Sequence, residues 1–439
     1  MAVLNRLGKV NEVGKAFGVA KLRVEAGEID FSMPRLESKT DPGHKGFVVR
    51  RLGSLDQKRA AARRDFTINS MAYDWKDGVI LDPFNGKKDL ESRILRHTSE
   101  AFVEDPLRVL RGFQFCSRFH LTAAEETIEL CQGIKRAYHE LPVERIWMEW
   151  EKWATRSARP SLGLKFLKET GWMTHYPELN DLVNCPQDPL WHPEGDVFVH
   201  TCHCLDAMVG LETYKNADRS GRLALMFATL THDIGKPSTT VQKEKEGAVR
   251  WVSPGHDQAG PSLAGSFLQS IGAPPLGLIP RVKALVSCHM AAIQIQERPS
   301  RAQVRRLARK LRPGSLAELF AVIRADQAGR PPRHPGPSQG LLELEAVAVE
   351  ESLASQAPRP IVLGRHLLAK GLEPGPQFKT ILDALFERQL DGEFSSLKEA
   401  QPFIDELGKE GKDGEMEKWS DGERLTTEAT EGTEEGSED

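Results

Sequence analysis

The stretch Arg63-Arg-Asp-Phe-Thr-Ile-Asn69 places two guanidinium groups, a carboxylate and a side-chain amide around one turn of the chain. Arginine side chains bind phosphate oxygens in pairs, and aspartate and asparagine can bind sugar hydroxyls. Such a set suits a nucleoside triphosphate. The alternative is a helix N-terminus at which Asp65 is the N-cap and the arginines are solvated. The residues alone leave both interpretations open.

A second charged motif, Phe102-Val-Glu-Asp-Pro-Leu-Arg-Val-Leu-Arg111, follows. Because Asp105 precedes a proline, the favoured arrangement for a helix start, the sequence predicts a helix that begins here. Arg108 and Arg111 then lie on one helix face, and Glu104 and Asp105 can reach back towards them. Donors beside acceptors can recognise the edge of a base. An ordinary helix start with ion pairs is the alternative.

Outside these motifs, the hydrophobic pattern divides the chain into a part with strands and a helical part. Strand-like segments occur at residues 17–24, 28–33 and 78–81. From about residue 100 the apolar spacing is helical, and Gly and Pro mark the breaks. The proline-rich residues 330–337 predict a loop. The sequence thus predicts an α+β protein, with a small α/β head followed by a mostly α-helical body.

The composition is that of a globular protein with several domains: of 439 residues, 39% are hydrophobic and 28% are charged. The six cysteines form no CxxC pair, so we expect reduced and mostly buried thiols. Neither a membrane-spanning run nor a signal peptide is found, which predicts a cytoplasmic protein without a membrane partner. Residues 409–439 are acidic and are expected to be disordered. The remainder is mildly basic, which is compatible with a nucleic-acid partner.

Histidines and aspartates recur in the second half of the chain in the order H…HD…H…H…D. The residues are His200, His232, Asp233, His256, His289 and Asp326. A single such histidine is more often a core residue, but imidazole nitrogens and carboxylate oxygens together suit Mn, Fe, Ni, Co or Mg. An adjacent His-Asp pair can ligate one ion or bridge two, and Lys236 could contact phosphate. The pattern therefore predicts a metal centre for phosphoester hydrolysis.

A thiol-rich site at Cys202, His203 and Cys204 is not expected. Consecutive residues stand on different sides of one helix and cannot converge on one ion.

The motifs occur in an order that resembles the bacterial transfer RNA nucleotidyltransferase and poly(A) polymerase family. They are Asp30 within Ile-Asp-Phe, the 63–69 motif, residues 82–96, the 102–111 motif, and Glu144-Arg-Ile-Trp-Met-Glu149. The resemblance spans residues 8 to about 330. It implies a polymerase-β-like head, a helical neck, and addition of CMP and AMP, or of AMP alone, to an RNA 3′ end such as that of tRNA, with CTP, ATP and Mg²⁺.

The resemblance also implies roles for individual residues. It implies that Asp30 is a catalytic carboxylate. The ribose and the triphosphate would be bound by Arg63, Arg64, Asp65 and Asn69. The base edge would be contacted by Asp105 and Arg108 with support from Glu104 and Arg111, and Glu144, Arg145 and Glu149 would position these groups from a neck helix.

The histidine and aspartate set resembles the HD phosphohydrolase superfamily, which many bacterial members of the family carry fused. It implies that His200, His232, Asp233 and Asp326 are ligands of a divalent transition metal such as Ni²⁺, Mn²⁺ or Co²⁺. His256 and His289 would complete a second site or contact phosphate. An alternative function is therefore a phosphohydrolase that acts on 2′,3′-cyclic phosphates or nucleotides. A non-catalytic RNA or nucleotide binder is the third alternative.

One family element is not found: the chain has no Gly-Gly or Gly-Ser turn followed by Asp-x-Asp. We expect that the first part of the catalytic head is missing, through a mis-set start or a truncation, and that transferase activity is affected. The expected domains are a partial head (1–95), a neck that binds nucleotide and RNA (96–180), an HD domain (181–350) and a small helical module (358–405). The sequence leaves the oligomeric state open.

Overall fold

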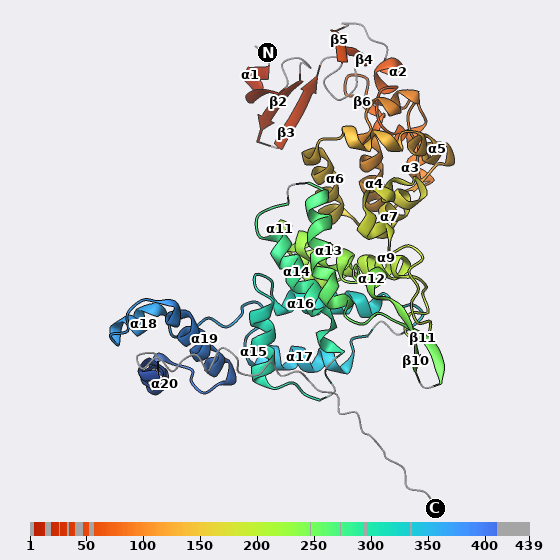
Figure 1. The fold of residues 1–439 in the computed structure, drawn as a ribbon. Coiled ribbons are helices and arrows are strands. Elements are labelled where there is room, and N and C mark those ends of the chain that lie inside the picture. The colour runs from red at the N-terminus through yellow and green to blue at the C-terminus, as the bar shows by residue number, and fades with distance from the viewer. Residues whose placement is uncertain are drawn as a thin grey trace, which may run out of the picture. The chain divides into compact units, whose positions relative to one another are not determined.

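The computed structural model describes most of the chain as helices with a few small sheets (Figure 1). The described residues are 4–13, 19–25, 27–32, 35–39, 47–51, 57–245, 247–272, 274–293, 295, 297–333 and 336–410. They form two compact units. One comprises residues 1–298 and 311–345, and the other comprises residues 299–310 and 346–439.

The head contains short strands that pair in sequence order. Its elements are α1 (Leu4–Leu7), β1 (Lys9–Val13), β2 (Val19–Val24), β3 (Gly27–Ser32), β4 (Arg35–Lys39), β5 (Phe47–Arg51), α2 (Gln57–Ala61), η1 (Thr67–Asn69), β6 (Ala72–Asp74), β7 (Val79–Leu81), α3 (Gly86–Glu91) and β8 (Ile94–Leu95). Strands β1, β2 and β3 form an antiparallel sheet in that order. Ala20 and Leu22 are buried on one face of β2, so the alternate residue Lys21, opposite Asp30, lies on the other face.

The neck is a set of helices packed around aromatic residues. Its elements are η2 (Glu100–Glu104), α4 (Leu107–Phe119), β9 (Thr122–Ala123), α5 (Glu125–Gly133), η3 (Lys135–Glu140), α6 (Val143–Arg156), α7 (Pro160–Glu169), η4 (Trp172–His175) and α8 (Pro177–Asn180). Phe113 of α4 contacts Trp150 of α6 with ring centroids 4.6 Å apart. A Cβ on Gly163 of α7 would collide with Ser117 of α4. Close packing of α4 against α6 and α7 therefore holds in place the part of the second charged motif, residues 107–111, that belongs to α4.

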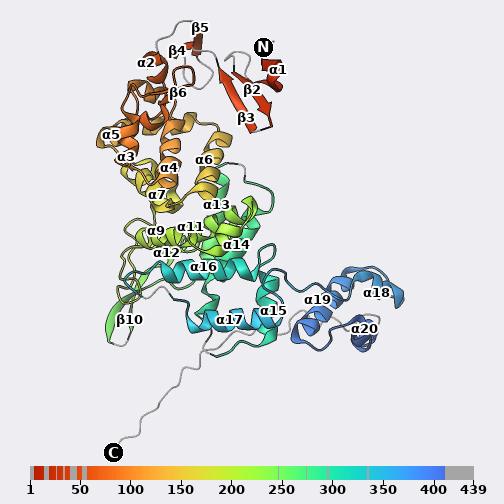
Figure 2. The ribbon, with the colours of Figure 1, turned by 180° about the vertical axis from the view of Figure 1, so that it is seen from behind.

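The next region is helical and surrounds one central helix. Its elements are α9 (Val197–Met208), α10 (Glu212–Asn216), α11 (Arg219–Thr231), α12 (Lys236–Thr239), β10 (Val241–Lys245), β11 (Ala248–Val252), α13 (His256–Ser270), α14 (Leu278–Cys288), η5 (His289–Ala292), α16 (Leu316–Ala328) and the first part of α17 (Gln339–Glu350). Residues 223–231 of α11 are buried all round the helix, as expected for a core helix. The hairpin β10–β11 extends away from the helices, as Figure 2 also shows.

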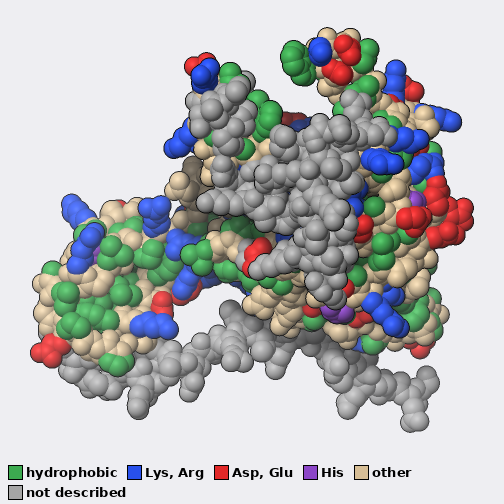
Figure 3. All heavy atoms as spheres, turned by 90° about the horizontal axis from the view of Figure 1, so that it is seen from above, with side chains coloured by type: hydrophobic (Ala, Val, Ile, Leu, Met, Phe, Trp, Pro, Cys, Tyr) green, Lys and Arg blue, Asp and Glu red, His purple; other side chains and the backbone are tan. Residues whose placement is uncertain are grey.

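The second unit is smaller and has its own core. Its helices are α15 (Arg301–Lys310), the rest of α17, α18 (Gly364–Ala369), α19 (Pro376–Asp391) and α20 (Leu397–Glu410). Leu367, Ile381, Leu385 and Ile404 are buried together. Figure 3 shows hydrophobic side chains on the surface of this unit among basic and acidic ones.

Most expectations about secondary structure are confirmed. Strands β2, β3 and β7 lie within or beside the three predicted strand segments, and all six cysteines are free and buried. The helix predicted at the 102–111 motif begins at Leu107. The hairpin β10–β11 was not predicted. The expected disorder of the acidic tail falls mainly on residues 411–439, outside the described residues. Among the described residues, no helix is long and apolar enough to cross a membrane.

Candidate functional site

The two basic motifs meet in a pocket between the head and the neck, here called the arginine pocket. Its volume is about 260 Å³. It is lined by Arg63, Arg64, Asp65, Asn69, Asp105, Leu107, Arg108, Arg111 and Arg145. The structure therefore brings together most of the residues that the sequence predicts as nucleotide-binding.

Asp65 is the buried anchor of the first motif, with 5% of its surface exposed. Its Oδ1 accepts hydrogen bonds from the backbone N–H of Phe66 (2.9 Å) and from Nδ2 of Asn69 (3.0 Å). Its Oδ2 accepts from Nε of Arg111 at 2.6 Å. The short helix η1 has Phe66 at its N-cap, so Asp65 is not the N-cap of a helix but a link between the two motifs.

The second motif is held by an arginine of the neck helix α6. Arg145 donates two hydrogen bonds to the carboxylate of Asp105, at 2.9 and 3.4 Å. Arg108 donates to the backbone carbonyls of Ala101 (2.5 Å) and Arg63 (2.6 Å), and burial lowers the pKa of its guanidinium. Because their partners are fixed, Asp105 and Arg108 are presented to the pocket in one orientation.

The remaining predicted residues of the first site differ in position. Arg63 pairs with Glu104, whereas Arg64 is exposed at the pocket and has no side-chain partner among the described residues. Glu144 is exposed. Glu149 is buried and pairs with Lys152 at 2.7 Å, away from the pocket lining.

Asp30 lies on β3 as predicted, but it does not line the arginine pocket. Its carboxylate is exposed and lies 3.8 Å from Lys21, which also binds Glu28 at 2.5 Å. Across the described part of the head, no group of three potential metal ligands comes together. The described head residues therefore do not fit a two-ion Mg²⁺ site.

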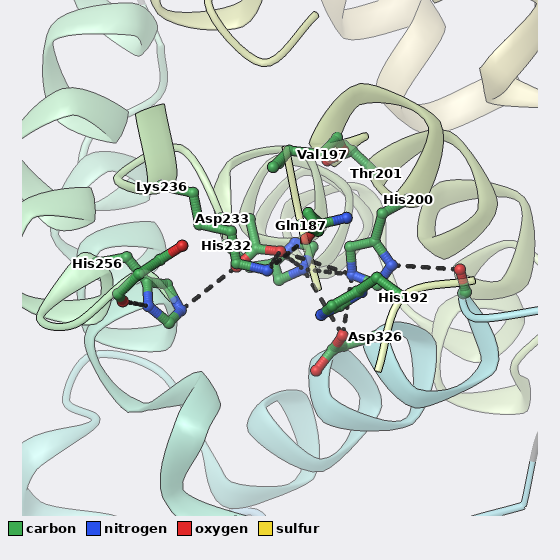
Figure 4. A network of polar contacts seen from close by, with 12 residues as sticks. Gln187, His192, Val197, His200, Thr201, His232, Asp233, Lys236, His256 and Asp326 are labelled. Carbon is green, nitrogen blue, oxygen red and sulfur yellow. Dashed lines mark hydrogen bonds and ion pairs between the residues drawn. The ribbon is translucent and has the colours of Figure 1, made fainter. Parts of the chain in front are cut away.

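The six predicted histidine and aspartate residues do converge, and they form what we call the HD centre. Figure 4 labels all of them except His289. Each comes from a helix or a helix end: His200 from α9, His232 and Asp233 from the end of α11, His256 from the start of α13, His289 from the end of α14, and Asp326 from α16. None has more than 6% of its surface exposed. The packing of these helices around α11 thus brings together residues that are far apart in the sequence.

The four imidazoles are oriented alike, with Nδ1 bound outside the centre and Nε2 directed into it. The Nδ1 atoms of His232, His256 and His289 lie 2.8, 2.7 and 2.7 Å from backbone carbonyl oxygens. Nδ1 of His200 lies 2.7 Å from the Glu194 carboxylate. An Nδ1–H donor leaves the Nε2 lone pair for a metal ion, which is the usual arrangement of histidine ligands.

Asp233 divides the HD centre into two halves. Its Oδ2 lies 3.2 Å from Nε2 of His232 and 3.6 Å from that of His200, whose Nε2 is also 3.0 Å from Asp326 Oδ1. Its Oδ1 lies 3.4 Å from Nε2 of His256 and 3.8 Å from that of His289. One carboxylate therefore faces two groups of ligands, as expected of a bridge between two ions.

The two carboxylates of the centre are held in the charged form. Burial alone would raise the pKa of Asp233, but His232 and Lys236 keep it well below the usual range. Burial would likewise raise the pKa of Asp326, which Arg330 and His200 hold well below its usual value. Buried carboxylates, together with imidazoles that release their Nε2 protons when a cation binds, form a donor set that fits divalent transition ions.

A large pocket of about 820 Å³ opens on the HD centre. Asp233, His256, His289 and Asp326 line it together with the basic residues Lys236, Lys243, Lys245, Arg330 and Arg333 and the aromatic residues Trp191 and Trp251. The arginine Arg333 lies over the ring of Trp191, 4.9 Å from its centroid. Three of these residues belong to the β10–β11 hairpin, for which the turn glycine Gly247, with its positive φ, is the local signal in the sequence.

Comparisons with known proteins support the family that the order of the motifs indicates. A model of the poly(A) polymerase head domain matches residues 4–96. A multifunctional CCA protein of Halorhodospira halophila is 34% identical over 327 residues, which cover 73% of this chain and 71% of that protein. A multifunctional CCA protein of Nitrosococcus oceani is 34% identical over 353 residues, which cover 79% and 77%.

Solved structures share the fold. The CCA-adding enzyme of Bacillus stearothermophilus, in complex with CTP, has a TM-score of 0.61 at 20% identity and covers 94% of this chain and 87% of its own. That of Thermotoga maritima, complexed with tRNA, has a TM-score of 0.50 at 18% identity and covers 92% and 82%. Since relatives at 34% identity align over more than two thirds of both chains, this chain belongs to the family of the multifunctional CCA proteins, which are tRNA nucleotidyltransferases.

Proposed function

We propose that this protein adds CMP and AMP to the 3′ end of tRNA, with CTP and ATP bound in the arginine pocket. The observation that carries this proposal is the fixed pair Asp105 and Arg108. Their carboxylate and guanidinium line one pocket with Arg64, a candidate for phosphate binding, and Asn69, a candidate for ribose binding. Relatives whose structures contain CTP or tRNA support these ligands. In this arrangement the chain supplies base recognition by hydrogen bonding and phosphate binding by charge.

The proposal assigns no step to Mg²⁺, because the described head residues do not fit its site. Nucleotidyl transfer of this kind uses divalent ions, and Asp30, the one catalytic carboxylate that the resemblance implies, lies 3.8 Å from Lys21. Nucleotide binding and nucleotide transfer must therefore be measured separately.

The test uses the full chain and tRNA that lacks its terminal CCA. Incorporation of labelled CTP and ATP is measured with Mg²⁺, and binding of CTP and ATP is measured by calorimetry without RNA. We expect CTP and ATP to bind and GTP and UTP to bind less tightly. If the four nucleotides bind alike, the Asp105 and Arg108 assignment is wrong. We also expect incorporation of labelled CMP and AMP, which would require carboxylates other than the described set; a chain that binds CTP and ATP but incorporates neither would refute the proposed transfer.

We propose as a second function a metal-dependent phosphohydrolase at the HD centre. The observation that favours it is Asp233, whose two oxygens face separate ligand groups. His200, His232 and Asp326 would hold one ion, His256 and His289 the other, and Asp233 both. When bound, the ions would supply Lewis-acid activation of a phosphoester and of water.

The chain's own residues would select the substrate. Lys236 lies 2.7 Å from Asp233 Oδ2, and Lys236 and Arg330 line the pocket beside the centre, where they can bind phosphate oxygens. The rings of Trp191 and Trp251 offer surfaces for a base. Nucleotides and 2′,3′-cyclic phosphates, including those at RNA ends, fit this combination.

The test of the second function compares nucleotide phosphoesters with a small reference phosphoester, after removal of metal and addition of Ni²⁺, Mn²⁺, Co²⁺ or Mg²⁺. Hydrolysis that requires one of the transition ions and favours 2′,3′-cyclic nucleotides is expected. Equal activity in the presence of a chelator would show that the HD centre does not act through metal.

These functions correspond to the domains proposed for the chain. The head (1–95) and neck (96–180) would carry nucleotide and RNA binding, and residues 181–350 would carry hydrolysis. The small module (358–405) has an independent core and would serve chiefly in packing.

A further inference from the structure

The thiol of Cys204 lies inside the HD centre. Cys204 stands one helical turn after His200 on α9 and is fully buried. Its Sγ is 3.3 Å from Nε2 of His200. With His200, His232 and Asp326 it forms a group whose ligand atoms all lie within 4.8 Å of one another. Neither Cys202 nor His203 joins this group, so the three consecutive residues do not converge, as predicted, but one of them reaches the centre.

The distances match those between ligands of a single ion. A nitrogen at about 2.1 Å and a sulfur at about 2.3 Å from one ion stand about 3.1 Å apart at a right angle and about 3.6 Å apart at the tetrahedral angle. The Sγ–Nε2 distance of 3.3 Å falls between these values. The Nε2 atoms of His200 and His232, 3.4 Å apart, have the spacing of two nitrogen ligands of the same ion.

Packing holds the sulfur in this place. A Cβ on Gly329, which follows α16, would collide with Sγ of Cys204, so the glycine leaves the room that the thiol fills. The carbonyl oxygen of Gly329 lies 3.2 Å from Nδ1 of His200. The thiol also lies 3.8 Å from Nδ1 of His200 and 3.8 Å from the carbonyl oxygen of Asp326, and both distances are long for a hydrogen bond.

We propose that Cys204 is a thiolate ligand of the ion held by His200, His232 and Asp326. The thiol proton passes to solvent as the ion binds. This position then offers nitrogen, oxygen and sulfur and prefers a thiophilic ion, whereas the group of Asp233, His256 and His289 offers nitrogen and oxygen alone. The two halves of the HD centre thus take different ions. The inference rests on the proposed metal centre and goes beyond it by making the halves unequal.

The test is a titration of the metal-free protein with Co²⁺ under anaerobic conditions. Thiolate coordination gives a sulfur-to-cobalt charge-transfer band in the near ultraviolet, which nitrogen and oxygen ligands do not give. We expect the band in the wild-type protein and its loss in Cys204→Ser. The matched control is Cys202→Ser, because Cys202 is equally buried on the same helix but lies outside the ligand group; this variant should keep the band.

A second variant keeps the test decisive if Cys204→Ser folds poorly, which circular dichroism would report. In His256→Ala the bound Co²⁺ should fall from two ions to one, with the thiolate band unchanged. If two Co²⁺ ions bind to the wild-type protein without the band, or if Cys204→Ser retains it, the ligand role of Cys204 is refuted while the metal centre stands. If no Co²⁺ binds at all, the proposed metal centre itself is refuted, and this inference with it.

Discussion

The arginine pocket and the HD centre differ in how their polar groups are satisfied. In the arginine pocket the carboxylates of Asp65 and Asp105 are neutralised by Arg111 and Arg145 from the same chain. In the HD centre two buried carboxylates meet four imidazoles whose Nε2 atoms point at one another. The charges of these carboxylates are therefore paired within the protein, and the first site offers hydrogen bonds to a ligand. In the second, the Nε2 atoms are directed at two neighbouring positions, one on each side of Asp233.

This difference indicates which ligand each site needs. Ion pairs within the arginine pocket fix the orientation of side chains that then recognise a base, so the pocket exists before the nucleotide arrives. Converging imidazole lone pairs gain a stabilising partner when a cation binds. The two sites should therefore respond independently to substitutions and to metal removal, and the predictions below test that independence.

The largest effect is expected from Asp233→Asn. The amide keeps the shape of the side chain but cannot hold two ions. The metal affinity and the rate of phosphoester hydrolysis should therefore each fall by more than about 100-fold. Binding of CTP and ATP, measured by calorimetry, should be unchanged. The matched control is Asp257→Asn, next to His256 but outside the ligand groups, which should retain hydrolysis. Loss of nucleotide binding in Asp233→Asn would mean that the two sites are coupled.

The next effect is expected from Arg145→Lys in the arginine pocket. Lysine keeps the charge but not the two parallel hydrogen bonds to Asp105, so discrimination of CTP and ATP against the other nucleotides should fall by about 10-fold, with smaller changes in overall affinity. Phosphoester hydrolysis should stay at the wild-type rate. Lys152→Arg, on the same helix but paired with Glu149, serves as the control. Unchanged discrimination would remove the orienting role of Arg145.

The sequence alone predicted which residues belong to the two sites better than it predicted which residues they contact. The pair Asp-Pro marked the start of α4, and the H…HD…H…H…D order marked the HD residues, because both signals are local or depend on residue type. The bidentate bond from Arg145 to Asp105 joins residues 40 positions apart, and the bond between His200 and Asp326 spans 126 positions. Such pairings follow from helix packing, which no local pattern encodes.

Two features of the HD centre depend on helix packing in the same way. The sequence left open whether the adjacent His-Asp pair ligates one ion or bridges two, and the carboxylate of Asp233 faces both ligand groups because α11 ends between α9 and α13. The place of Cys204 depends on Gly329, which the chain reaches 125 residues later. The head shows the opposite case, since Asp30 was placed on a strand by its neighbours but lies outside the arginine pocket lining.

Metal removal should have an effect on stability. If the free ion concentration is well above the dissociation constant of the folded HD centre, a chelator should remove about 2 to 4 kcal/mol from the free energy of unfolding. The thermal midpoint should then fall by about 5 °C or more. The measurement is a thermal scan of the metal-loaded protein with and without chelator. Asp233→Asn should show no such shift, and a shift of equal size in that variant would place the bound metal elsewhere.

The smallest effect is expected from pH at the edge of the arginine pocket. His97 bridges Phe66, next to Asp65, and burial, with a smaller contribution from Arg96, lowers its pKa from 6.5. As the pH falls below 6.5 the unfolded chain takes up the proton first, so stability present above that pH declines until the folded imidazole is also protonated. Between pH 7.5 and 5.5 the thermal midpoint of the wild-type protein should therefore fall more than that of His97→Gln, whereas His366→Gln, in the other unit, should follow the wild type. If the thermal midpoints of His97→Gln and of the wild type fall in parallel with pH, His97 does not contribute to the pH dependence of stability at the arginine pocket.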